Sequence, residues 1–105
     1  MTVAAMTSNQ RTIKREEDVR TALCHFDLMW RLYVRGQGNR GELDEARTIA
    51  ITRVGHYMLD LANAIEGEDA TTMRALAAQL QAQKSLSPYQ LAAQADLAER
   101  LARLT

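Results

Sequence analysis

The sequence is poor in residues that break helices, cross-link chains or favour strands. Among 105 residues there are one proline, five glycines and one cysteine, Cys24. A single cysteine excludes an intramolecular disulfide, and a reducing cytosol is the simplest compartment for such a chain. Valine and isoleucine together supply only 8 residues, whereas alanine and leucine, both strong helix formers, supply 30. The composition therefore predicts an all-α fold.

The chain also lacks net charge and long apolar runs. Its 13 basic and 13 acidic side chains cancel, which excludes a general electrostatic attraction to nucleic acid or anionic lipid. No run approaches the ~18 apolar residues that span a bilayer, and residues 1–10 lack the regions of a secretory signal. We expect a cytoplasmic protein without membrane contact. Residues 1–12 are predicted to form a flexible tail and residues 13–105 a single helical domain.

The first periodic segment spans residues 15–34. Its apolar side chains recur at three- and four-residue steps, which places them on one helical face. They are Val19, Leu23, Phe26, Trp30 and Tyr33. Residues 28–34 alone are apolar except at Arg31 and also fit a short strand, but the spacing sustained over the whole segment favours a helix. Three glycines within residues 35–41 then predict a loop.

A second, longer helix is predicted over residues 40–66. Asn39, with Glu42 three residues later, forms a capping-box pattern at its start. Gly67 fits the left-handed position that follows a helix. Eight side chains form its apolar stripe: Leu43, Ala46, Ile49, Ala50, Val54, Tyr57, Leu61 and Ile65.

Two shorter helices follow. Asp69 or Thr71 is expected to cap a helix over residues 70–84, and Ser87 with Pro88 is a strong start for a helix that runs almost to the last residue. The sequence therefore predicts three or four helices, with the two long ones antiparallel and joined by the glycine-rich loop. The long second helix and the aromatic first helix indicate a helical homodimer.

Charge is unevenly distributed along the chain. Residues 11–40 carry a net charge of +3, residues 41–69 a net −5 and residues 70–105 a net +2. Solvated faces, together with contacts between a basic first helix and an acidic second one, explain this distribution. Self-association steered by complementary charge is the alternative.

The glycines at 36, 38 and 41 match the dinucleotide-binding fingerprint. In that fingerprint the glycines follow a buried strand, and an acidic residue about twenty positions on ends a second strand. Here a helix is predicted before the glycines, and Asp60, at the required distance, lies within the second helix. The glycines are therefore interpreted as a turn between helices, and no cofactor is expected.

Cys24, His25 and His56 are the residues best suited to metal binding or nucleophilic chemistry. Neighbours on a helix point about 100° apart, so Cys24 and His25 do not chelate one ion from a regular helix. A cysteine–histidine hydrolase would need the fold to bring these groups into contact. With no nucleophile, base and orienting group together, we expect no catalytic or metal site and a protein that is not an enzyme.

The aromatic side chains of the first helix are the predicted anchors of an interface. Phe26, Trp30 and Tyr33 share one face beside Arg31, which is typical of a core or subunit interface and less often of base stacking. Gly55, within the second helix, costs up to ~1 kcal/mol relative to alanine and indicates close approach of another helix. These five residues predict a small interaction or regulatory module that acts through self-association or a protein partner.

Residues 86–95, Leu-Ser-Pro-Tyr-Gln-Leu-Ala-Ala-Gln-Ala, resemble the opening of phage-repressor-type helix-turn-helix domains. That family continues with a turn containing glycine and serine, where this chain has Asp96-Leu97-Ala98. The resemblance implies a DNA-binding regulator that contacts DNA through Gln90, Arg100 and Arg103. The alternative is that residues 86–95 are simply the capped start of an alanine-rich helix with no role in DNA binding.

Basic residues in and next to the first helix could add phosphate contacts to the DNA-binding alternative. They are Arg11, Lys14, Arg15, Arg20, Arg31, Arg35 and Arg40. Arg31 and Arg35, one turn apart, flank the aromatic side chains and are the candidate nucleic-acid contacts. Four acidic residues interrupt this surface, so DNA binding remains the alternative to the interaction module.

Overall fold

The computed structural model describes residues 8–65, 67–83 and 85–103, with side chains from Lys14 onward. Within these ranges it has four helices and no strand. The helices are α1 (Ser8–Val34), α2 (Arg40–Ala64), α3 (Glu68–Ala82) and α4 (Pro88–Arg103). The predicted all-α fold is confirmed.

The first helix is longer than its periodicity predicted. It begins at Ser8, so residues 8–12, expected in a flexible tail, are helical, and residues 1–7 lie outside the described part of the chain. Residues 28–34 form its last turns, so the strand alternative is wrong. Arg31 lies 3.1 Å from Asp27, one turn earlier, which is a pairing that only a helix allows.

The predicted caps of α2 and α4 are present. Asn39 has extended backbone angles, and its Oδ1 accepts a hydrogen bond from the Glu42 amide at 2.8 Å. At the start of α4 the Ser87 hydroxyl accepts from the Gln90 amide at 3.2 Å, and Gln90 Oε1 accepts from the Ser87 amide at 2.8 Å. Ser87 and Gln90 thus form a complete capping box.

The start of α3 differs from the expectation. Its N-cap is Gly67, which has a φ of 78° and a ψ of −151° and makes no side-chain cap. This is a glycine conformation outside the left-handed helical region, so the predicted role of Gly67 is wrong. Asp69 lies within the first turn of α3, where its negative charge interacts favourably with the helix dipole. Thr71 donates its hydroxyl to the Gly67 carbonyl at 3.4 Å.

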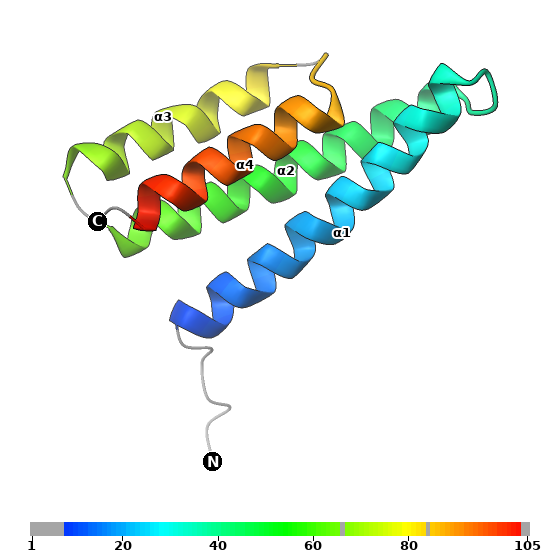
Figure 1. The fold of residues 1–105 in the computed structure, drawn as a ribbon. Coiled ribbons are helices and arrows are strands. Elements are labelled where there is room, and N and C mark those ends of the chain that lie inside the picture. The colour runs from blue at the N-terminus through cyan, green and yellow to red at the C-terminus, as the bar shows by residue number, and fades with distance from the viewer. Residues whose placement is uncertain (1–7, 66, 84, 104–105) are drawn as a thin grey trace.

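The second helix is the centre of the molecule. Figure 1 shows α1 and α3 on either side of α2, with α4 stacked over it. All three helices pack against α2, whereas α1 and α3 do not contact each other in the described part of the chain. The molecule is flat, measuring 48 × 38 × 19 Å. Since α4 covers only one broad face of α2, the opposite face is left open.

The core is one continuous cluster with residues from all four helices. Its largest fully buried side chains are Phe26, Met58, Met73, Leu80, Leu91 and Val54. Burial of each such side chain stabilises the fold by about 1.5–3 kcal/mol. Alanines 46, 50 and 62, almost fully buried along α2, let the neighbouring helices approach closely. The radius of gyration, 15.0 Å, exceeds the ~13 Å of a compact chain of this length, which agrees with the flat shape.

Candidate functional site

The aromatic residues predicted to form an interface do not share one surface. Phe26 is fully buried in the core, with the Arg47 guanidinium 5.6 Å from its ring centroid. Trp30 is half-buried against the same core, and Tyr33, near the end of α1, is 39% exposed. Phe26 is therefore part of this chain's own core and is not available to a second molecule.

Arg31 lies at the surface between α1 and α4. Its Nε is 3.1 Å from the Asp27 carboxylate, and hydrogen bonding to Asp27 is the main cause that raises the pKa of the guanidinium. Tyr89, which is 58% exposed, lies close enough to contribute to the same effect. The ion pair of Arg31 thus lies within α1.

Gly55 does permit a close approach, but within the chain. It is buried, and a Cβ built there would lie 2.9 Å from Gln81 Nε2 of α3. The approaching atom is the end of a flexible side chain, which can move aside.

We therefore expect Gly55→Ala to raise the free energy of unfolding by up to about 1 kcal/mol, because alanine is the better helix former. Gly55→Leu should lower it by about 1–3 kcal/mol through overpacking against α3. Denaturant unfolding at fixed protein concentration measures both. If Gly55→Ala lowers the free energy of unfolding as much as Gly55→Leu does, the Gln81 amide does not set the α2–α3 distance. A rigid contact then sets it.

The helix-turn-helix resemblance does not extend to the structure. Helix α4 runs without interruption through residues 96–98, where the family has its turn. The glycine and serine that would end the first motif helix are absent, and Asp96 instead pairs with Arg100 one turn later at 3.0 Å. Gln90, expected to face a base, holds the N-terminal cap of α4. The helix predicted from Pro88 almost to the end of the chain is therefore confirmed as far as Arg103.

The remaining candidate nucleic-acid contacts are dispersed. Arg103 pairs with Glu99 on α4. Arg35 is exposed just beyond the end of α1, far along the chain from these residues. The structure thus does not gather the predicted contacts into one surface of uncompensated positive charge.

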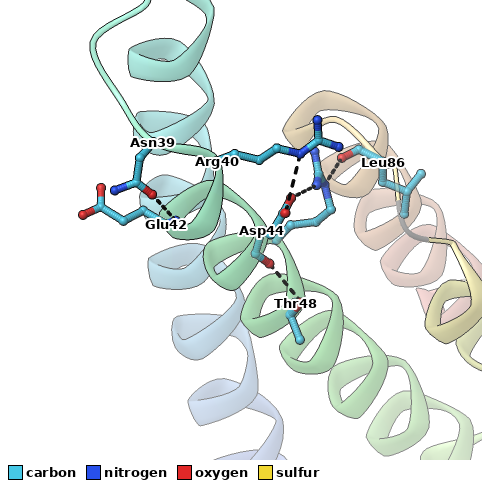
Figure 2. Close-up of polar contacts among 7 residues, drawn as sticks. Asn39, Arg40, Glu42, Asp44, Thr48 and Leu86 are labelled. Atoms are coloured by element: carbon cyan, nitrogen blue, oxygen red, sulfur yellow. Dashed lines mark hydrogen bonds and ion pairs between the residues drawn. The ribbon is translucent and has the colours of Figure 1, made fainter.

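Arg47 is a structural residue that sequence reasoning did not identify. Its side chain is only 13% exposed. Nε donates to the Leu86 carbonyl at 3.0 Å, and Nη1 donates to Asp44 Oδ1 at 2.8 Å (Figure 2). Arg47 therefore connects α2 to the loop before α4 and also covers Phe26. The Leu86 carbonyl lies 39 positions away in sequence, so no local pattern could reveal the contact.

The groove beside Arg47 has a volume of about 470 Å³. It is lined by Arg40, Asp44, Arg47, Thr48, Ile51, Thr52, Gln81 and Gln83. Asp44 pairs with Arg47 and lies 3.8 Å from the exposed Arg40 (Figure 2). Two donors of Arg47 are thus bound by a carbonyl and a carboxylate of its own chain.

Two further polar contacts tie α1 to α2. Arg15 Nε lies 2.9 Å from Asp60, the acidic residue considered above for nucleotide binding. The buried Tyr57 hydroxyl donates to Glu16 at 3.4 Å. Burial, followed by the nearby carboxylates of Glu16 and Glu99, raises the pKa of Tyr57 and keeps it a neutral donor. Asp60 therefore has a structural partner.

The residues considered for metal or nucleophilic chemistry are separate. Cys24 is an exposed free thiol on α1. His25 lines a groove between α1 and α2, whereas His56 lines one between α2 and α3. In the part of the chain that the structure describes, no three histidine, cysteine, aspartate or glutamate residues are grouped to hold a metal ion. Nor does any described helix combine the length and apolarity needed to cross a membrane.

The open face of α2 is flanked by two grooves. A groove of about 310 Å³ lies between α1 and α2, and another of about 390 Å³ lies between α2 and α3. Between them runs a line of residues that we call the α2 stripe. It consists of Glu45, Ile49, Thr52, His56, Leu59 and Asn63. Ile49 and Leu59 are each 42% exposed. Ile49, expected in the buried stripe of this helix, therefore lies on its open side.

The α2 stripe carries two exposed apolar side chains, Ile49 and Leu59, among four polar ones. Its residues follow one another at steps of four, three, four, three and four, which is the seam spacing of a helix that packs against another helix. Glu42 and Glu45 make the start of α2 acidic. At the other end Arg74 of α3 donates to Asn63 Oδ1 at 3.3 Å, which places a positive charge beside the stripe.

Comparisons of this chain with protein-family models, curated proteins and solved structures returned no match. No relative therefore indicates a function. The α2 stripe and its two flanking grooves are the features from which a function is best inferred.

Proposed function

We propose that this protein is a non-enzymatic helical interaction module that acts by self-association, with the α2 stripe as the surface on which two copies meet. The observation that supports this proposal is the exposed pair Ile49 and Leu59, at seam spacing on the open face of α2. A cytoplasmic location fits the exposed thiol of Cys24, which stays reduced there.

The energetic argument is the burial of apolar surface. Ile49 and Leu59 lie on a face of α2 that no helix in the described part of the chain covers, and contact with a second copy would remove both from water. A stable interface covers about 800 Å² of each partner. The flat shape, with its two longer dimensions of 48 and 38 Å, provides a face of sufficient size.

The interface anchors expected from sequence contribute differently to this proposal. Gly55 borders the stripe in the groove between α2 and α3. Trp30 packs against the core, and Arg31 pairs with Asp27, so neither carries the proposed contact. The DNA-binding alternative has no supporting observation among the described residues, because the turn is absent and the α4 arginines are paired.

We expect the double substitution Ile49→Glu with Leu59→Glu to raise the dimer dissociation constant at least about 100-fold, because charges would be buried in the contact. Sedimentation velocity over a concentration series measures this effect. Leu97→Glu, at a leucine of α4 that is 53% exposed, is the control and should dimerise like the unmodified protein. Circular dichroism melting verifies that each variant folds. Unchanged dimerisation of the folded double variant would refute the proposed surface.

A further inference from the structure

We infer that the two copies pack antiparallel along α2, with the two-fold axis level with position 54 on the stripe side of the helix, so that Ile49 of each copy faces Leu59 of the other. The orientation and register depend on the proposed self-association. They follow from the spacing of the α2 stripe and from the distribution of charge along it.

The stripe has the same spacing in both directions. Ile49 and Leu59 are equally far from position 54, as are Thr52 and His56, and Glu45 and Asn63. When the second copy of α2 runs in the opposite direction, each stripe residue therefore faces a different residue of the partner helix, as in antiparallel coiled coils. The apolar pair then forms two identical layers, flanking a central polar layer of Thr52 and His56. A seam of this spacing has a reversal centre about every 3.5 residues, and the centre at position 54 is the one that brings Ile49 opposite Leu59.

Charge favours the same orientation. In the antiparallel arrangement Glu45 of one copy faces Asn63 of the other, and Arg74 is held beside Asn63. Glu45 of each copy thus lies near Arg74 of the other. A parallel arrangement would place Glu45 opposite its own copy, and like charges directly opposite repel. Arg53 lies near the axis in both arrangements, is exposed, and has a side chain long enough to extend into water.

Disulfide trapping distinguishes the two arrangements. The experiment uses a Cys24→Ser background, which removes the native thiol, with Ile49→Cys and Leu59→Cys introduced in separate chains. In an antiparallel pair, positions 49 and 59 face each other. The same position in the two copies is then separated by about 15 Å along the helix, which is too far for a disulfide.

We expect neither single variant to cross-link with itself and the mixture of the two to cross-link within minutes under mild oxidation. Mass spectrometry should identify the linkage between positions 49 and 59. Self-linked dimers of each single variant would overturn the antiparallel register while leaving self-association intact. A monomeric background protein in sedimentation, with no linkage in any sample, would refute the self-association itself.

Discussion

Replacing Phe26 with alanine is expected to lower the free energy of unfolding by about 3–5 kcal/mol, the range for deletion of a buried aromatic ring. Phe26 is fully buried, and its ring lies beneath the Arg47 guanidinium. Removal of the ring leaves a cavity where α1 meets α2 and takes away the surface on which Arg47 rests. A loss of this size is a large part of the stability of a small domain.

Urea unfolding followed by circular dichroism measures this change. Tyr33→Ala is the matched control, seven residues further along the same face of α1 but 39% exposed, and should cost less than about 1.5 kcal/mol. Phe26→Leu retains most of the volume and serves if the alanine variant does not fold. If Phe26→Ala lowers the free energy of unfolding by less than about 1 kcal/mol and also weakens self-association, Phe26 is part of the interface and not of the core.

Replacing Arg47 with alanine is expected to lower the free energy of unfolding by about 2–4 kcal/mol. The estimate combines about 1.5–3 kcal/mol for a charged hydrogen bond with a smaller contribution from the contact with the Phe26 ring. The variant leaves the Leu86 carbonyl without the donor that Arg47 supplies, 3.0 Å away. The loop before α4 should consequently exchange its amide hydrogens faster.

Two variants isolate this contribution. Arg40→Ala removes a more exposed arginine, 3.8 Å from the same Asp44, and should change stability by less than about 0.5 kcal/mol. Arg47→Met keeps the apolar stem and should recover the packing but not the hydrogen bond. Equal losses for Arg40→Ala and Arg47→Ala would mean that Arg47 contributes only surface charge.

Much of the fold was predictable because its signals are local. The capping patterns at Asn39 and Ser87 identify the starts of α2 and α4, and periodicity identifies the helical bodies between them. Gln90 shows that a local signal can also be overlooked. A serine followed three residues later by glutamine is a capping-box pattern, and it explains Gln90 better than contact with DNA does.

The positions of the helices relative to one another were not predictable in the same way. Phe26 and Tyr33 occupy the same face of α1, but only Phe26 is fully buried. Ile49 follows the apolar period of α2, yet the flat arrangement leaves its side of the helix open. Which apolar residues become core depends on where α4 packs, and that is set by contacts between residues distant in sequence.

Sedimentation equilibrium of the unmodified protein, from low to high micromolar concentration, tests the central claim most directly. The account predicts a reversible increase from the chain mass of 11.8 kDa to twice that mass, with the increase abolished by Ile49→Glu with Leu59→Glu. A mass of one chain at every concentration would contradict self-association through the α2 stripe.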